Sequence, residues 1–154
     1  MKLFTKTRFK LGMDCQTKLY YSEKDEYVDI SSTDPFLEAL ANGGYQVGEL
    51  AKCDYPKGVE VETHDIHKAY KQTQDLLTRE SVEIFEAALV HEGLAARVDV
   101  LIKRERVITL LEVKSKSYDA GTTRFMTLKS GALTSKWAPY LYDIGFQHYI
   151  ASCL

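Results

Sequence analysis

The chain has 154 residues, which fits one domain and is long enough to bury a core without disulfides or a structural metal. Hydrophobic residues make up 45% and charged residues 27% of it, and the formal net charge is -2. This composition is that of a globular protein, and the whole-chain charge by itself does not indicate a nucleic-acid binder. Three cysteines are too few, and odd in number, for a disulfide framework.

The N-terminal segment does not resemble a signal peptide, because basic residues interrupt it at Lys2, Lys6, Arg8 and Lys10. No apolar run approaches the roughly 20 residues that a membrane span requires. We therefore expect a cytoplasmic location and no membrane partner. The last residues, 150–154, are mostly apolar and compatible with a helix, whereas a helix more often ends in a Gly or Asn cap or in a polar tail. We therefore interpret residues 1–154 as a single domain that is the N-terminal fragment of a longer protein.

The first third of the chain is predicted to be helical. Thr5 is a suitable N-cap for a helix that runs to about Tyr21, and the polar residues 22–32 are predicted to form a loop. Two short helices are expected beyond this loop, one from Asp34-Pro35 to Gly43-Gly44 and one over residues 45–53.

The middle of the chain changes from helical to strand-like periodicity. Residues 58–62 alternate and predict a short strand, and Thr63 or His64 is the expected cap of a helix that reaches Leu77. Three strands are expected next, over residues 81–90, 94–102 and 107–113. Their short connections imply antiparallel neighbours.

After a loop over residues 115–130, a final helix is expected to begin near Ser135. The order of the elements favours an α/β fold, in which helices flank a central sheet. Trp137, Tyr140 and Tyr142 are candidates for stacking on unpaired bases, although Trp137 also has the spacing of a core residue.

Basic residues gather near both ends of the chain. Residues 2–18 contain five basic residues and the single acid Asp14, and residues 114–136 contain five basic residues and the single acid Asp119. Acids concentrate within residues 23–92. If the two ends of the chain meet, they present one basic face; otherwise they form two ordinary solvated surfaces.

Ionisable residues interrupt two of the apolar strands. Asp99 lies between valines, and Glu112 and Lys114 follow a run of leucines. A buried carboxylate costs free energy unless it is paired or bound to metal. Glu112 and Lys114 are two residues apart and should share a strand face, and a tight hairpin would bring Asp99 beside them. The alternative is a structural Glu112–Lys114 ion pair, with Asp99 in a turn.

Two carboxylates and an ammonium suit a divalent-cation site. Mg²⁺ prefers hard oxygen ligands, usually one or two carboxylates together with water. Such an ion acidifies a bound water and neutralises phosphate charge, and a neighbouring lysine steadies developing negative charge. The residue types therefore suit hydrolysis of phosphodiester bonds with Mg²⁺ or Mn²⁺.

The pattern of Asp99 followed by Glu112-x-Lys114 resembles the PD-(D/E)XK nuclease superfamily, and within it the RecB-like branch, which includes the CRISPR-associated exonucleases. The chain is also similar to the nuclease-like N-terminal region of a bacterial family of uncharacterised proteins. The resemblance rests on residues 5–9, 15–20, 84–88, 97–101, 111–115 and 142–147. It covers nearly the whole chain and implies a restriction-endonuclease-like fold, with a central mixed sheet flanked by helices.

By this resemblance, Asp99 and Glu112 would bind the metal, with the backbone carbonyl of Val113 as a further ligand. Lys114 would be the catalytic lysine. Glu86 matches an acidic residue that the superfamily carries on the preceding element, and its alternative is a strand-edge glutamate.

Gln147 matches a glutamine of the RecB-like branch that helps to position the site and the DNA. Asp143, four residues before it, is expected to hydrogen-bond to it. The sequence departs from the branch at Ala151, where a tyrosine usually stands, and Tyr149 lies nearer to Gln147.

Branch members also often carry a histidine on the first core helix, and His64 and His67 are both candidates, or else capping or surface histidines. Some members hold an iron–sulfur cluster on four cysteines. Cys15 and Cys153 have suitable places, but Cys53 does not and two ligands are missing, so no cluster is expected in this chain.

The leading hypothesis is a Mg²⁺- or Mn²⁺-dependent deoxyribonuclease. The alternative is a non-catalytic nucleic-acid-binding module that keeps the nuclease fold, and a third possibility is an assembly domain that contacts no nucleic acid. The sequence leaves open the strandedness of the substrate, DNA versus RNA, cutting at ends or internally, the pathway and the oligomeric state.

Overall fold

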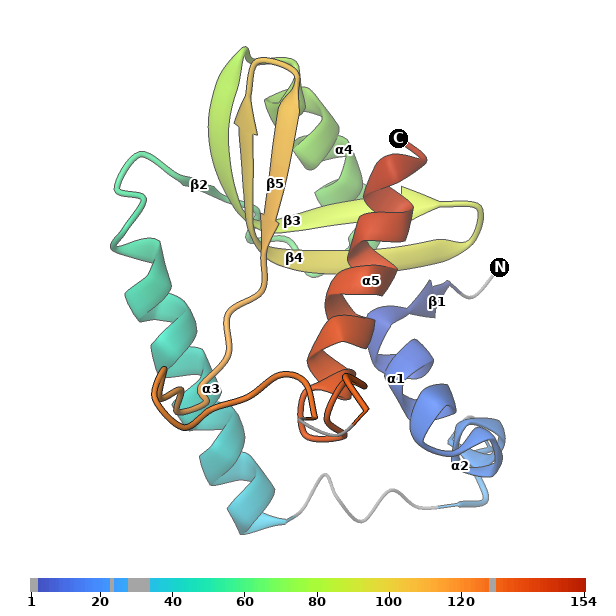
Figure 1. Ribbon diagram of the computed structural model, residues 1–154. Coiled ribbons are helices and arrows are strands. Elements are labelled where there is room, and N and C mark those ends of the chain that lie inside the picture. The colour runs from blue at the N-terminus through green and yellow to red at the C-terminus, as the bar shows by residue number, and fades with distance from the viewer. Residues whose placement is uncertain (1–2, 23, 28–33, 128–129) are drawn as a thin grey trace.

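A computed structural model describes residues 3–22, 24–27, 34–127 and 130–154. Five strands form one open, mixed sheet (Figure 1). They are β1 (Phe4–Thr5), β2 (Val59–Glu60), β3 (Ser81–His91), β4 (Leu94–Arg104) and β5 (Val107–Leu111). The order is β1-β4-β3-β2, and β5 pairs with the same edge of β4 as β1, further along the strand.

Two tight turns connect the three long strands. β3 and β4 are antiparallel and meet at Glu92-Gly93, where both residues have positive φ, 44° and 84°. A two-residue turn of this hand matches the natural twist of a hairpin. β5 returns antiparallel to β4, so the predicted antiparallel neighbours are confirmed. β1 and β2 are added in parallel to β4 and β3, which makes the sheet mixed.

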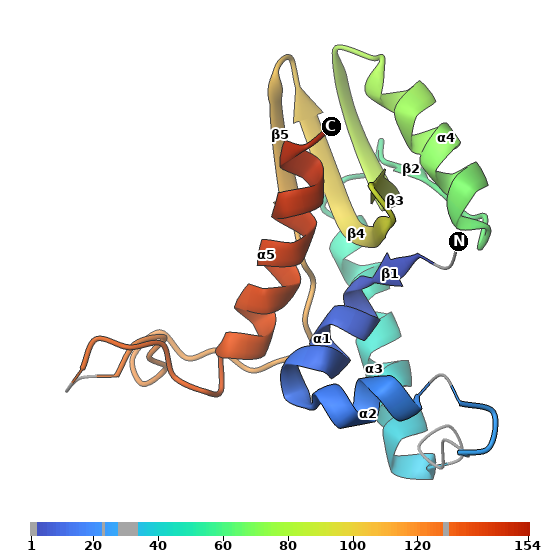
Figure 2. The same ribbon diagram turned by 90° about the vertical axis from the view of Figure 1, so that its right-hand side faces the viewer.

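Five helices complete the described structure: α1 (Lys6–Asp14), α2 (Gln16–Tyr21), α3 (Pro35–Lys52), α4 (Ile66–Leu77) and α5 (Ala138–Ser152). Figure 2 shows the long strands between α4 on one side and α5 on the other. α1 packs against α5, and the Phe9 and Phe146 rings stack with centroids 4.9 Å apart. The fold is thus α/β, with helices flanking a central sheet.

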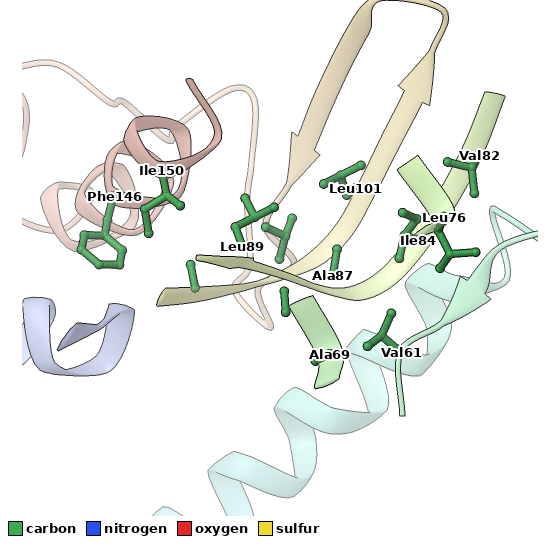
Figure 3. Close-up of a cluster of buried hydrophobic side chains, with 13 residues drawn as sticks. Val61, Ala69, Leu76, Val82, Ile84, Ala87, Leu89, Leu101, Phe146 and Ile150 are labelled. Carbon is green, nitrogen blue, oxygen red and sulfur yellow. The ribbon is translucent and has the colours of Figure 1, made fainter. Parts of the chain in front are cut away.

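The core lies between the sheet and these helices (Figure 3). α4 contributes Ala69 and Leu76, and α5 contributes Phe146 and Ile150. The sheet contributes mainly residues of β3 and β4, among them Val82, Ile84, Ala87, Leu89, Val98 and Leu101. Burying such side chains stabilises the fold by about 25 cal/mol per Å² of apolar surface. Most of the core therefore belongs to the two strands that also carry Glu86 and Asp99.

The predicted helix from Thr5 to Tyr21 is two helices. Thr5 caps the first as predicted, because its side chain accepts a hydrogen bond from the Arg8 N–H, 3.4 Å away. Cys15 then adopts an extended backbone, with φ -159° and ψ 112°, and becomes the N-cap of α2. The pair of residues before α1 forms β1, which the sequence analysis did not predict.

The two short helices predicted on either side of Gly43-Gly44 are one continuous helix, α3. Asp34 caps it as expected, accepting from the Phe36 N–H at 2.9 Å. A glycine inside a helix costs only about 1 kcal/mol, and the surrounding helix-forming residues outweigh this cost. The loop predicted over residues 22–32 lies largely outside the described residues.

Several boundaries differ from prediction. β2 is shorter than the strand predicted over residues 58–62, and β4 runs two residues beyond its predicted end. Asp65, and neither Thr63 nor His64, caps α4, since its carboxylate accepts from two backbone N–H groups of the first turn. α5 begins at Ala138 with a proline in its first turn, three residues later than expected. β5 ends at Leu111, so residues 112–114 follow the strand without regular secondary structure. No helix of the described residues is long and apolar enough to span a membrane.

Candidate metal centre

β3 and β4 place two carboxylates opposite each other. Phe85 pairs with Val100 and Ala87 with Val98, so Glu86 stands across from Asp99. Glu86 has φ 54°, a left-handed conformation that residues other than glycine rarely adopt, and the strand is distorted there. Both carboxylates line a cavity of about 690 Å³. Backbone strain held inside a strand at a cavity wall is a feature found at functional sites.

Glu112, just beyond β5, is the centre of a hydrogen-bond network. Its side chain is 3% exposed. The Lys6 ammonium donates to both of its carboxylate oxygens, at 2.9 and 3.0 Å. The Gln147 amide donates to Oε2 at 2.6 Å, and the Lys114 ammonium donates to Oε1. Three side chains from separate parts of the sequence thus fix this one carboxylate.

Asp99 is joined to the same segment through the backbone. The Val113 N–H donates to Asp99 Oδ2 at 2.6 Å. This bond holds the residues after β5 against β4. Glu112, Val113 and Lys114 all line the cavity that contains Asp99 and Glu86. Five of the six predicted site residues therefore meet in one cavity, and Gln147 reaches it by its bond to Glu112.

The two candidate histidines are placed differently. His64 lines the cavity, in the segment that precedes α4. His67 is exposed in the first turn of α4, where its backbone N–H donates to Asp65 at 2.9 Å. His64 is therefore the histidine that can approach a ligand in the cavity.

Burial and mutual repulsion act on the carboxylates. Burial raises the pKa of Asp99, and the charge of Glu112 raises it further, against the Val113 N–H and the nearby lysines. The pKa of Glu86 is likewise raised by burial and by Asp99. Burial also opposes ionisation of Glu112, but hydrogen bonds from Lys114 and Gln147 and the charge of Lys6 outweigh it and lower its pKa.

Lys114 keeps its positive charge at this site. Burial lowers its pKa, but the hydrogen bond to Glu112 and the charges of Glu112, Asp99 and Asp143 raise it above the ordinary value. Its ammonium is 3.7 Å from Asp143 Oδ2. Lys114 is therefore protonated at neutral pH and acts as a hydrogen-bond donor, not as a base.

The sequence analysis did not identify Lys6 and Asp143 as site residues. Lys6 reaches Glu112 because β1, directly before it, pairs with β4 and because α1 packs on α5. Lys6 and Lys114 line one cavity, so the N-terminal basic segment meets the beginning of the second one, as one of the two alternatives predicted. Asp143 is fully buried, and its Oδ2 is 3.1 Å from the Lys10 ammonium. Gln147 donates to Glu112 instead of forming the predicted bond with Asp143. The only sequence feature that pointed to these contacts was the group of basic residues near the N-terminus, which includes Lys6 and Lys10.

α3 provides the opposite wall of the cavity. Gly44, Tyr45, Gly48, Glu49 and Lys52 line it, on successive turns of the helix. A side chain added at Gly44 or Gly48 would meet open space, so these glycines widen the cavity. Near the end of the helix, Lys52 bonds Glu49 and Glu60 at 2.7 and 2.6 Å. These bonds outweigh burial and raise the pKa of Lys52 to about 12.

Arg97 supports the floor of the cavity. Its Nη1 donates to the carbonyl oxygens of Val61 and Glu86, each at 3.1 Å, and its Nη2 donates to that of Thr63. The guanidinium thus ties the segment after β2 to the distorted position of β3. Because this half-buried arginine satisfies carbonyls on two segments, it fixes the position of Glu86 relative to His64.

The chemistry of the donors fits a divalent cation. Asp99 and Glu112 line one cavity and repel each other, and a cation between such carboxylates relieves that repulsion. Among the residues that the structure describes, no three His, Cys, Asp or Glu side chains form a group able to hold a metal by themselves. The fitting ligand set is therefore two carboxylates completed by a backbone carbonyl and water, as is usual for Mg²⁺.

Asp99→Asn is expected to stabilise the metal-free protein at neutral pH. Because the pKa of Asp99 is raised in the folded state, its ionisation opposes folding as the pH rises above the ordinary value of 3.8. In EDTA at pH 7.5 the variant should melt about 2–4 °C above the wild type, and the two should converge near pH 4. Thermal denaturation followed by circular dichroism measures this; a lower melting temperature for the variant at pH 7.5 contradicts the repulsion.

Searches with this chain against family profiles, characterised proteins and solved structures give no significant match.

Proposed function

We propose that the chain is a metal-dependent nuclease that hydrolyses phosphodiester bonds in DNA, with the restriction-endonuclease-like fold of the PD-(D/E)XK superfamily. One observation carries the proposal: Asp99, Glu112 and Lys114, which the sequence suggested for this chemistry, line a single cavity together with Glu86, which the family resemblance added. Gln147, chosen from the same resemblance, bonds directly to Glu112.

Asp99 and Glu112 are the residues that would hold Mg²⁺ or Mn²⁺, together with the carbonyl of Val113. Such a cation, when bound, acidifies water and neutralises charge on a phosphodiester. The N–H of Val113 keeps Asp99 oriented, and Gln147 and Lys6 keep Glu112 oriented. These three act as positioning residues, because they set the carboxylates before any ligand enters.

Lys114 and Lys6 provide positive charge where a phosphate would enter the cavity. Lys114 is protonated and 36% exposed, so it can turn from Glu112 to donate to a phosphate oxygen as negative charge develops. Lys6 is 20% exposed and remains near the same carboxylate. Glu86, whose pKa is raised by burial and by Asp99, lines the same cavity and would be an acceptor or donor for a bound water there.

The alternative is a nucleic-acid-binding module that keeps this fold without cutting. One observation favours this alternative: the charge of Glu112 is already neutralised by ion pairs with Lys6 and Lys114, so this carboxylate does not require a metal ion. Such a module would bind DNA with a strong dependence on salt and would leave it intact.

A cleavage assay distinguishes the two. Purified protein is incubated with single-stranded and with duplex DNA in Mg²⁺, in Mn²⁺ and in EDTA, and the products are resolved on a denaturing gel. Cleavage with a divalent cation and none in EDTA supports the proposal. Salt-sensitive binding with no cleavage in either metal selects the alternative.

A further inference from the structure

A second cavity, of about 1010 Å³, adjoins the first. It lies between α1, α2 and the beginning of α5, and Lys6 and Lys114 line both cavities. Its volume is at the upper end of the range of small-molecule sites. A ligand chain that passes these two lysines can therefore occupy both cavities at once.

The lining of the second cavity combines positive charge with aromatic rings. Lys10 and Lys18 join Lys6 and Lys114 in it, against the two acids Asp14 and Asp143. Tyr21, Tyr27 and Tyr142 also line it, and they are 39%, 55% and 40% exposed. The Tyr21 and Tyr27 rings lie 4.6 Å apart between centroids. Lysines with accessible aromatic faces are the combination by which proteins hold unpaired nucleotides.

Asp143 adds a buried acceptor that lacks a donor. Its residue is 0% exposed, and its Oδ2 faces Lys10 and Lys114 at 3.1 and 3.7 Å. Its other oxygen, Oδ1, is buried and has no hydrogen-bond partner among the described residues, although Asp143 lines the cavity. An unsatisfied buried acceptor costs free energy, which a ligand with an N–H group would recover.

We infer that the second cavity binds one unpaired nucleotide whose base carries an exocyclic amino group, within the strand whose phosphodiester bond enters the first cavity. The base stacks on the tyrosines, its amino group donates to Asp143 Oδ1, and its phosphate lies near Lys10 and Lys18. The position next to the reacting bond rests on the proposed function, whereas occupation of the cavity does not depend on cleavage.

The test compares two strands that differ at the amino group. Short fluorescent oligomers of deoxycytidine and of deoxyuridine are titrated with the protein in EDTA, where metal-dependent cutting is stopped, and anisotropy is recorded. Cytosine has an exocyclic amino group where uracil has a carbonyl oxygen. We expect the deoxycytidine oligomer to bind about tenfold more tightly, because uracil would place an oxygen against Asp143.

Two exposed positions test the place of binding. Tyr27→Ala and Lys18→Ala should each weaken binding of the deoxycytidine oligomer, Tyr27→Ala by about tenfold through the loss of stacking. Tyr149→Ala and Lys71→Ala are matched controls, since Tyr149 is equally exposed at 55% and neither residue lines this cavity. The controls should bind as the wild type does.

Equal affinity for the two oligomers would overturn the inference, as would equal effects of Tyr27→Ala and Tyr149→Ala. Free deoxycytidine monophosphate that displaces the oligomer at an equal concentration would overturn it too. A strand that occupies both cavities should bind more tightly than a single nucleotide, because its two binding units are covalently joined. A chain that cuts DNA without discriminating cytosine from uracil keeps the proposed function and loses this inference. A chain that binds the deoxycytidine oligomer more tightly than the deoxyuridine oligomer, but does not cut DNA with metal, keeps this inference and loses the proposed function.

Discussion

Lys114→Ala is expected to lower the rate of metal-dependent DNA cleavage by about 10²–10³-fold, the usual effect of removing one donor that stabilises developing negative charge. The fold should survive, because the side chain is 36% exposed and Glu112 keeps its bonds to Lys6 and Gln147. The measurement is the initial rate of product formation at saturating Mn²⁺, with circular dichroism to compare the folded states.

Lys71→Ala is the matched control for this variant. It removes the same charge from an exposed position of α4, outside the cavity, and should keep the wild-type rate. Cleavage by Lys114→Ala at the wild-type rate would mean that Lys114 only pairs with Glu112, which is the structural alternative that the sequence left open.

Glu112→Gln is expected to lower the rate of metal-dependent cleavage by at least about a hundredfold, because one of the two metal-binding carboxylates loses its charge. It should also destabilise the metal-free protein by about 1–2 kcal/mol, since Lys6 and Lys114 lose their anionic partner but can still reach water. The pKa of Glu112 is lowered in the folded state, so this stability is present above the ordinary value of 4.5 and is lost as the pH falls.

Urea denaturation in EDTA at pH 7.5 and near pH 4 checks this expectation. Glu83→Gln is the control, because Glu83 pairs with Arg104 far along the hairpin and lines neither of the two cavities near Glu112. It should leave cleavage unchanged. Two carboxylates in one cavity should thus respond in opposite ways: Asp99→Asn should stabilise the metal-free protein and Glu112→Gln should destabilise it. The same sign for both would contradict the electrostatics described above.

The hairpin and its carboxylates were accessible from the sequence, because they depend on local patterns. Apolar runs separated by Glu92-Gly93 and by a turn predicted at Arg104-Glu105 indicated two antiparallel pairings, which the structure confirms. The second turn lies one residue later than predicted, at Glu105-Arg106. Once β4 and β5 pair, Asp99 and the residues after Leu111 must lie close together. The position of Glu86 opposite Asp99 follows from the same register.

Features that depend on packing between distant segments were not predictable in this way. Lys6 reaches Glu112 because β1, directly before it, pairs with the edge of β4 that also holds β5, and because α1 packs on α5 through Phe9 and Phe146. Asp143 is buried by that same packing. A single sequence has no periodicity that reports such a contact, so the basic N-terminal segment allowed two outcomes.

Predictions of helix ends also failed, because the free energies that favour or oppose a helix end at one residue are small. Gly43-Gly44 suggested a helix end, yet α3 continues through them because each glycine costs only about 1 kcal/mol. Cys15 carried no sign of a helix break, and the chain turns there to place α2 beside the second cavity. Both cases concern walls of the cavities, and the sequence therefore predicted the carboxylates of the site better than its shape.

Calorimetric titration with Mn²⁺ tests the central claim most directly, comparing the wild type with Asp99→Asn. The account predicts a binding isotherm for the wild type that is absent from the variant, while the metal-free variant is folded and melts at the higher temperature. Binding of equal affinity to both proteins, or none to the wild type with a phosphodiester substrate analogue present, would contradict a metal site built on Asp99 and Glu112.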